Sequence, residues 1–546
     1  MYINSLELER LKPRILVVDN EPKTRVAYQS LLMEWGYEPV LAMGMGTSLL
    51  SDAKNKAAEK RCALALIDLR VIDDEDEHDI SGLTLAEEIG DKLRPIILSG
   101  YENLNVLRTM LQKHIEIAFV RKTDSRNLIE KTLEEEAAKV TAQKRKLAFE
   151  NPEILKDIAE SPLGQNTKEY TDQVADLFAR LFPDATKLKL EKLELRPASS
   201  NISSVPRPTS VVLKVYEEDF EPYVVKLARA PKIQDEVEKY RKYVFRRHTY
   251  GFTARLERSS ILWDIGGISY SYIGSFDVKT FSLFYEEKSI AEITECLRSF
   301  FEITWCRHYE QAREERNISL FELYAKVWGD WYEKVLRAFP SANSMEFDSI
   351  HKGFDLPDPV KWLKTKVAEN PNDQSRVPQT RLATTHGDLH GDNLLVDSKK
   401  IAWVIDFERC GEGHALQDFI ELEADIINRL EAHNENLPAY LKMCFTVFKP
   451  KGIQRFEESE ITSEDPRIEK ALQTISILRS LALKCTKIAD AREYLFGLLF
   501  NMIFRAAMLQ KTNPQKGRHT LLLASLICHR LDHWEEDWPP IELNLT

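Results

Sequence analysis

Short apolar stretches alternate with amphipathic ones over the first 135 residues. The apolar runs cover residues 14–22, 37–43, 63–70, 94–100 and 115–122. Residues 24–35, 83–89 and 104–113 instead place apolar side chains at helical spacing. Apolar strands that alternate with helices predict a parallel sheet covered on both faces. We therefore expect residues 1–135 to form an α/β domain around a five-stranded parallel sheet.

Helical patterns continue beyond this first domain. Residues 126–149 are rich in Glu, Lys, Ala and Leu and predict one long charged helix. A second helical pattern covers residues 169–182, after turn-forming residues between 151 and 167. We interpret residues 136–185 as a helical linker. A dimerising helix, and hence a homodimer, is the alternative, although the heptads are imperfect.

The pattern becomes strand-rich from residue 186. The segments that predict strands are LKLEKLELR, SVVLKVY, YVVKLAR, ILWDI and ISYSYIG, and a helix over 233–244 interrupts them. After residue 280 helical patterns dominate, apart from a loop–strand region at 383–408. We expect an α+β domain with a sheet lobe over 186–275 and a helical lobe over 276–546. Residues 321–339 predict a single helix whose aromatic stripe lies in the core, with a binding wall as the alternative.

Composition narrows the classes of function. The chain has 546 residues and a net charge of −12, which argues against general nucleic-acid binding. No apolar run reaches the roughly 18 residues needed to cross a membrane, and the N-terminus lacks the apolar core of a signal peptide. The seven cysteines are scattered and form no CxxC pair. We therefore expect a cytoplasmic protein with reduced cysteines, no zinc site and no membrane partner.

Polar side chains stand at the ends of four predicted strands. Asp19, Asp68, Ser99 and Lys122 end the first, third, fourth and fifth strands. The carboxyl ends of parallel strands form the edge at which doubly wound folds bind ligands, so these side chains should converge. Carboxylate oxygens suit Mg²⁺, and a lysine can neutralise an acyl phosphate.

These residues, with the motif VVDNEP, resemble the response-regulator receiver family over residues 13–135. The resemblance implies a flavodoxin-like fold, Asp68 as phospho-acceptor, and Asp19 and Asp68 as Mg²⁺ ligands. It also implies a switch hydroxyl on Ser99, a phosphate-facing Lys122, and a sensor histidine kinase or other phosphodonor as partner. Asn20 stands where the family has a second acid, so one charge is lost and metal affinity should fall.

Two alternatives stay open for this first domain. Because of Asn20, it could keep the receiver fold without taking a phosphoryl group. The long acidic loop RVIDDEDEHDISG after Asp68 could add a metal ligand or could simply be solvated, and we favour the solvated loop.

The segment THGDLHGDNLLVDSKKIAWVIDFERC, residues 385–410, has the spacing of a phosphoryl-transfer site. Phosphoryl transfer needs a carboxylate near the acceptor hydroxyl and oxygen ligands for Mg²⁺ on the phosphates. Asp388, Asn393 and Asp406 can supply these groups from one loop–strand–turn. GDLHG alone also occurs in binuclear metallophosphatases, but their downstream GDxxDR and GNH elements are absent here.

The same segment resembles the HGDxxxxN…IDxE pattern of aminoglycoside and choline phosphotransferase-like kinases. The resemblance implies a bilobal kinase-like domain that uses ATP and Mg²⁺, with Asp388 as catalytic base and Asn393 and Asp406 as metal ligands. By the same resemblance Lys226 holds the nucleotide phosphates, and Ile273 lies near the adenine at the hinge. Helical spacing favours Glu236 over Glu238 as the partner of Lys226.

The predicted nucleotide-covering loop, residues 195–212, has four serines in ASSNISS but no glycine. Glycine normally lets backbone N–H groups approach phosphates closely. Our first hypothesis is a phosphorelay signalling protein in which the receiver regulates an ATP-dependent phosphotransferase of open acceptor specificity. The alternative is a pseudokinase scaffold that binds nucleotide or a partner protein. A nucleic-acid-associated regulator is third, because the chain is acidic.

Overall fold

The structure is a computed structural model of the chain. It describes residues 13–90, 92–100, 117–160, 168–192, 210–217, 222–245, 254–271, 278–340, 356–429, 437–453, 456 and 461–536. The predicted helix at 104–113, most of the nucleotide-covering loop and Ile273 lie outside these residues.

The first domain is built on a parallel sheet with the strand order β2-β1-β3-β4-β5. The strands are β1 (Arg14–Val18), β2 (Glu38–Leu41), β3 (Leu64–Asp68), β4 (Arg94–Ser99) and β5 (Ala118–Arg121). The helices are α1 (Pro22–Glu34), α2 (Gly46–Glu59), α3 (Ser81–Ile89) and α5 (Arg126–Lys146). Two buried clusters cover the sheet, with alternate residues of each strand in each cluster. The order 2-1-3-4-5 is the flavodoxin-like one, which confirms the predicted fold class.

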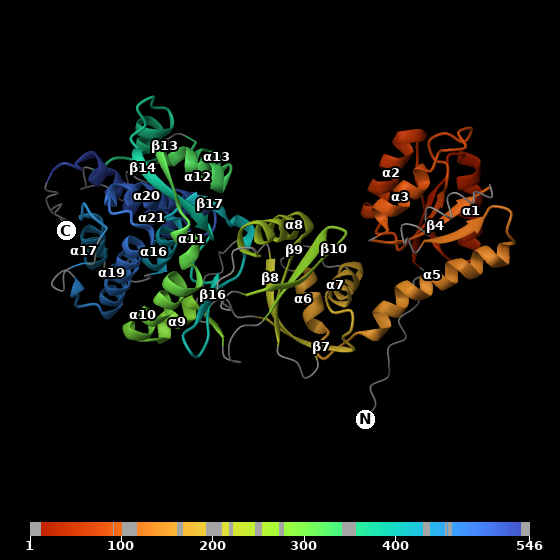
Figure 1. The fold of residues 1–546 in the computed structure, drawn as a ribbon, viewed down its shortest axis with the longest axis horizontal. Helices are drawn as coiled ribbons and strands as arrows, with labels where there is room; N and C mark the ends of the chain where they lie inside the picture. The colour runs from red at the N-terminus through yellow and green to blue at the C-terminus, as the bar shows by residue number, and fades with distance from the viewer. Residues whose placement is uncertain are drawn as a thin grey trace.

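Helix α5 leaves the first domain and leads to the second, as Figure 1 shows. It ends at Lys146, before the predicted end at residue 149, because Ala148–Phe149 forms strand β6 and pairs with β7. Helices α6 (Glu153–Glu160) and α7 (Lys168–Leu181) share a hydrophobic core with that sheet. The segment that we expected as a linker is therefore helical but largely packed, and we propose that the sheet lobe begins near Leu147.

The sheet lobe, or N-lobe, contains six strands in the order β10-β11-β9-β8-β7-β6. The further strands are β7 (Lys187–Lys192), β8 (Ser210–Glu217), β9 (Tyr223–Arg229), β10 (Leu256–Leu262) and β11 (Ile265–Ser271). Helix α8 (Ala230–Lys239) and a π-helical turn, Tyr240–Val244, follow β9. The prediction of ILWDI as one strand was wrong, because the chain reverses direction at Trp263–Asp264 between β10 and β11.

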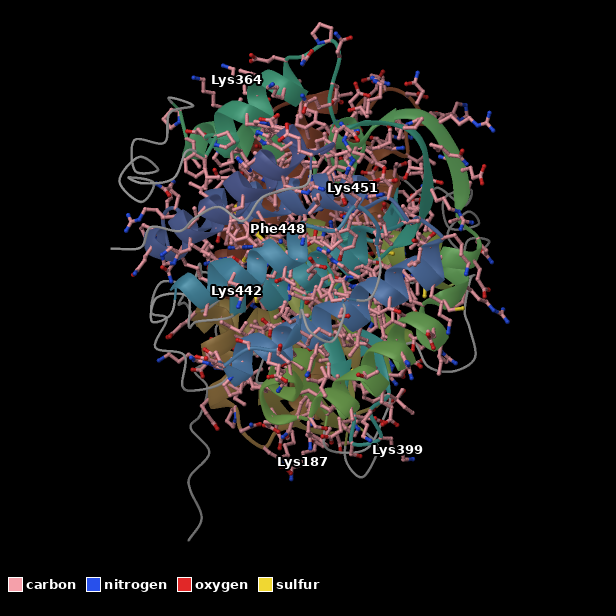
Figure 2. The ribbon with its side chains drawn as sticks, turned by 90° about the vertical axis from the view of Figure 1, so that its left-hand side faces the viewer. Lys187, Lys364, Lys399, Lys442, Phe448 and Lys451 are labelled. Atoms are coloured by element: carbon pink, nitrogen blue, oxygen red, sulfur yellow. The ribbon has the colours of Figure 1, made fainter. Side chains whose placement is uncertain are left out.

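The helical lobe, or C-lobe, carries two small three-stranded sheets, β12-β15-β16 and β13-β14-β17. Its strands are β12 (Lys279–Thr280), β13 (Arg313–Ser319), β14 (Arg376–Thr385), β15 (Leu394–Val396), β16 (Ala402–Val404) and β17 (Gly411–His414). Its α-helices are α9 (Phe281–Glu287), α10 (Ile290–Arg298), α11 (Cys306–Glu310), α12 (Leu320–Trp328), α13 (Trp331–Ala338), α15 (Pro359–Leu363), α16 (Gln417–Arg429), α17 (Leu437–Phe448), α19 (Pro466–Thr486), α20 (Ala491–Leu509) and α21 (Pro514–Asp532). Figure 2 shows the end of the molecule formed by this lobe, with Lys442 and Phe448 of α17 labelled.

The predicted single helix over residues 321–339 was wrong in one respect. The chain breaks it into α12 and α13 at Gly329, whose φ of 63° ends the first helix. The aromatic stripe is nonetheless in the core, as expected, because Tyr324, Trp328 and Trp331 are all buried. In the part of the chain that the structure describes, no helix is both long and apolar enough to cross a membrane.

Candidate functional site

Strand ends assemble the pocket of the first domain. Asp19 directly follows β1, Asp68 and Ser99 end β3 and β4, and Lys122 directly follows β5. The Lys122 Nζ lies 2.8 Å from Asp19 Oδ2 and 2.9 Å from Asp68 Oδ2. Both carboxylates are almost fully buried. The structure thus brings together the two acids and the lysine that the sequence places at this edge.

Electrostatics in this pocket favour a cation ligand. Burial, together with the neighbouring Asp19, raises the pKa of Asp68 to about 6, although Lys122 opposes the shift. Burial lowers the pKa of Lys122, but Asp68 and Asp19 outweigh this effect and raise it to about 12. Two buried carboxylates therefore share one ammonium group. The remaining negative charge suits a hard divalent cation such as Mg²⁺.

The backbone fixes the directions of these groups. The Glu21 N–H donates to Asp19 Oδ1 at 2.9 Å and so orients that carboxylate, while the preceding residue, Asn20, is half-buried. The Lys122 N–H donates to the Ser99 carbonyl at 2.9 Å, which places the buried Ser99 beside the lysine. Gly82, at the start of α3, approaches Asp68 so closely that a Cβ would lie 1.8 Å from the Asp68 carbonyl oxygen.

The acidic loop after Asp68 is exposed over residues 72–78. The Asp79 carboxylate accepts hydrogen bonds from the backbone N–H groups of Ile72, Asp73 and Ser81, at 2.8 to 2.9 Å. Burial raises the pKa of Asp79, but these hydrogen bonds outweigh it and lower the pKa below its ordinary value. Asp79 stabilises the loop through backbone hydrogen bonds, and residues 72–78 stay exposed. Both observations favour the interpretation of a solvated loop.

Lys226 is the centre of the second site. It lies on β9, is almost fully buried, and contacts Glu236 Oε2 and Asp406 Oδ1, both at 2.7 Å. Burial lowers the pKa of Lys226, but the two carboxylates reverse the shift and raise it above its ordinary value. The Tyr270 hydroxyl donates to Glu236 Oε1 at 2.7 Å. Of the two candidate partners, the structure pairs Glu236 with Lys226 and leaves Glu238 on the exposed side of α8.

Asp406 occupies the turn after β16. Its φ of 71° is in the left-handed region, which aspartate adopts more readily than most residues. Burial raises its pKa, but Lys226 dominates and lowers it to about 2, so this carboxylate stays ionised. The next residue, Phe407, donates its N–H to Glu236 Oε1 at 3.2 Å. One glutamate therefore holds both the strand lysine and the turn that carries Asp406.

The loop between β14 and β15 carries Asp388 and Asn393. The Asn393 Nδ2 donates to the Asp388 carbonyl at 3.0 Å, which closes the loop and fixes the spacing of the two residues. The Arg409 Nη1 donates to Asp388 Oδ1 at 3.2 Å. Burial raises the pKa of Asp388, but Arg409 and His390 outweigh burial and lower it. An ionised carboxylate at this position can accept a proton from an acceptor hydroxyl.

Helix α16 also stabilises the loop between β14 and β15. The Asp418 carboxylate accepts from the backbone N–H groups of His386 at 3.0 Å and Gly387 at 2.9 Å, and from the Tyr309 hydroxyl. Gly387 has a φ of +79°, and a Cβ there would lie 2.4 Å from the Arg409 carbonyl oxygen. The loop geometry therefore requires glycine before Asp388 and a buried acid beneath it.

The sequence analysis did not identify two residues that hold the second site in place, Arg409 and Tyr270. Arg409 follows the IDxE pattern directly, but only the fold brings its side chain to Asp388. Tyr270 lies on β11, in the predicted strand ISYSYIG, and nothing in its local pattern indicates that it holds Glu236. An aromatic hydroxyl at an inward-facing strand position is the one signal that could have identified Tyr270.

Comparison with known proteins gives matches to both halves of the chain. A family model described as Ternary complex associated domain 9 matches residues 332–503. Comparison with curated proteins gives no match. Among solved structures, the chain is similar to a CheY-like response regulator receiver domain protein from Methanospirillum hungatei JF-1, at 18% identity and a TM-score of 0.20. That match covers 24% of this chain and 98% of that chain.

Two further solved structures are also similar to the chain. LicA in complex with AMP is 12% identical, with 63% of this chain and 93% of that chain covered and a TM-score of 0.33. Aminoglycoside phosphotransferase APH(3'')-Id from Streptomyces rimosus ATCC10970 is 13% identical, with 50% and 90% covered and a TM-score of 0.26.

The sheet order of the first domain and the two lobes of the second define the class of the protein. The chain joins a flavodoxin-like domain of the receiver type to a bilobal, kinase-like domain.

Proposed function

We propose that the protein is a phosphorelay signalling protein whose receiver domain regulates an ATP- and Mg²⁺-dependent phosphotransferase domain. The observation that supports this most directly is the convergence of Lys226, Glu236 and Asp406 into one ion-paired cluster. Asp388 and Asn393, joined by a hydrogen bond, come from the preceding loop. These are the groups that phosphoryl transfer from a nucleotide requires.

Each group has a proposed role. Lys226 would bind the nucleotide phosphates, and Asn393 and Asp406 would hold Mg²⁺ on them. Asp388 would accept the proton of the acceptor hydroxyl, and Arg409 would hold its carboxylate in place. Ile273 remains our candidate for the adenine contact. The acceptor stays open among an alcohol or sugar, a protein and a nucleotide, because the same groups would serve each of these.

In the receiver, Asp68 would take a phosphoryl group from a sensor histidine kinase or another phosphodonor. Asp19 and Asp68 would hold Mg²⁺, with the Asn20 carbonyl as a further oxygen ligand. Lys122 and Ser99 would then contact the phosphoryl oxygens. We place the activity in the cytoplasm, where ATP and Mg²⁺ are available together.

A second candidate is a scaffold that binds nucleotide or a partner protein without phosphoryl transfer. The absence of glycine from residues 195–209 supports it, because close backbone contact with phosphates is then harder. The description of the family that matches residues 332–503 names association with a ternary complex, which also favours a protein partner.

Isothermal titration of ATP with Mg²⁺ tests the proposal. Wild-type protein should bind Mg·ATP, and Asp406→Ala should lose the metal-dependent part of the affinity. Asp373→Ala is a matched control, because Asp373 bonds Ser319 and Ser375, outside the proposed site. Failure of the wild type to bind Mg·ATP would overturn the proposed function and leave a protein scaffold.

A further inference from the structure

The turn between β10 and β11 touches both domains. Trp263 packs against the core of the N-lobe and also against the receiver core that contains Leu16, Val18 and Leu93. Beside it, Arg61 Nη2 of the receiver lies 3.8 Å from Asp264 Oδ1. A third contact joins the two domains nearby, where Arg180 of α7 donates to the Lys92 carbonyl at 3.3 Å. These contacts form one interface between the receiver and the back of the N-lobe.

Trp263, at the tip of this turn, is an unusual residue for a tight β-hairpin. Trp263 has a φ of 57°, in the left-handed region, where a two-residue hairpin turn usually has glycine or asparagine. The left-handed conformation is unfavourable for a bulky side chain. The contact of the indole with the receiver core offsets this strain, so the residue suits the interface rather than the hairpin.

The same turn holds the start of helix α8. The Ala230 N–H, at the first residue of α8, donates to the Asp264 carbonyl at 2.9 Å. The preceding residue, Arg229, pairs with the Asp264 carboxylate. On β11, a Cβ at Gly266 would lie 2.8 Å from Cβ of Ile233 in α8, so strand and helix are in direct contact. The position of the turn therefore sets the position of α8.

Helix α8 carries Glu236, which holds Lys226 at 2.7 Å and the Phe407 N–H at 3.2 Å. We infer that the Trp263–Asp264 turn couples docking of the receiver to the Lys226–Glu236 pair, and that the docked receiver stabilises this pair in its formed arrangement. The inference deepens the proposed function, because it names how the receiver reaches that site.

The docking contact uses the edge of the receiver opposite its pocket. Arg61 and Lys92 precede β3 and β4, whereas Asp68 and Ser99 end those strands. Figure 1 shows α2 and α3 of the receiver on the side that faces the N-lobe. The pocket edge is therefore directed away from this interface, and a phosphodonor can reach it while the receiver stays docked.

The first test removes the Trp263 side chain but keeps the backbone conformation of the turn. Trp263→Gly in the full chain removes the indole and suits a φ of 57°. Hydrogen exchange should become faster at residues 230–236, and titration should show Mg·ATP affinity about fivefold or more weaker. Asn317→Gly is the matched control, because Asn317 also has a positive φ, 52°, but lies on β13 of the C-lobe. Wild-type exchange and affinity in Trp263→Gly would overturn the inference.

A second variant changes only the receiver side. Arg61→Glu places a negative charge against Asp264 and should also speed exchange at residues 230–236 of the other domain. Lys54→Glu is its control, because Lys54 pairs with Glu88 inside the receiver. Unchanged exchange in Arg61→Glu would contradict the coupling. The exchange arm does not need nucleotide, so it separates failure of this inference from failure of the proposed function, in which the wild type binds no Mg·ATP.

Discussion

Asp388 and Asp406, the two aspartates with proposed roles in phosphoryl transfer, have different charged partners. Asp406 is paired with a buried lysine, which lowers its pKa to about 2. Asp388 instead contacts Arg409 at 3.2 Å. The two side chains keep similar exposed fractions, 24% for Asp406 and 28% for Asp388, so their charged partners distinguish them. The carboxylate beside the proposed phosphate-binding Lys226 suits a metal ligand, and the one held by Arg409 suits contact with an acceptor.

Replacing Asp388 by Asn separates binding from chemistry. The amide cannot take up a proton, so ATP turnover should fall about 10²–10⁴-fold while Mg·ATP binding is kept. Turnover is measured as phosphate release without an added acceptor, with the exposed Asp330→Asn as control. Equal rates in Asp388→Asn and wild type would exclude the proposed base.

Replacing Glu236 by Gln removes one partner of a fully buried ion pair. Loss of one partner of such a pair typically costs about 3–5 kcal/mol, and the second partner of Lys226, Asp406, should keep the cost near 3 kcal/mol. Exposed Glu238→Gln, two residues along the same helix, should change stability by less than about 0.5 kcal/mol. Thermal unfolding of the two variants measures the difference, and equal stability would show that the ion pair is not needed for the fold.

At the scale of elements, glycines set how closely helices approach β11. A Cβ at Gly266 would meet Ile233 at 2.8 Å, and one at Gly267 would meet Leu181 at 2.7 Å. Gly266→Ala should therefore destabilise the N-lobe by about 1–3 kcal/mol through overpacking. Gly517→Ala, within α21, should instead be neutral or stabilise by up to about 1 kcal/mol, because its nearest neighbour is 3.4 Å away. Thermal unfolding measures the stability change of each variant. An unchanged stability of Gly266→Ala would contradict this packing.

Much of both sites could be predicted from the sequence, because each depends on short-range order. Parallel strands must bring their carboxyl ends together, so Asp19, Asp68 and Lys122 could be placed without a structure. The fixed spacing of Asp388 and Asn393 likewise reflects a single loop. Arg409 could not be assigned in this way, since its partner is chosen by the packing of two separate segments.

Three elements were misjudged for local reasons. Helix α2 was not identified, although Leu49, Ala53 and Ala57 repeat at four-residue spacing and are buried. The helix predicted over 321–339 breaks because Gly329 adopts a positive φ. The turn at Trp263–Asp264 carries no glycine or asparagine, so the apolar pattern gave no sign that the chain reverses there.

At the scale of the whole molecule, the receiver has its pocket at one edge and the N-lobe at the other. Helix α5 leads from β5 to the N-lobe and packs beside α7, and Glu136 on α5 accepts from Arg94 at 2.9 Å. If Asp68 takes a phosphoryl group as proposed, the described residues offer at least two routes to the N-lobe, helix α5 and the interface that includes the Trp263–Asp264 turn. Regulation requires that both sites bias the same two-state element.

Control of the nucleotide site by the receiver can be measured by titrating Mg·ATP with and without beryllofluoride, which mimics an acyl phosphate on Asp68. We expect the Mg·ATP affinity to change about fivefold or more when the mimic binds. Asp68→Ala should show no response, because the mimic has no carboxylate to occupy. Identical affinities with and without bound mimic in the wild type would show that the receiver does not control the nucleotide site.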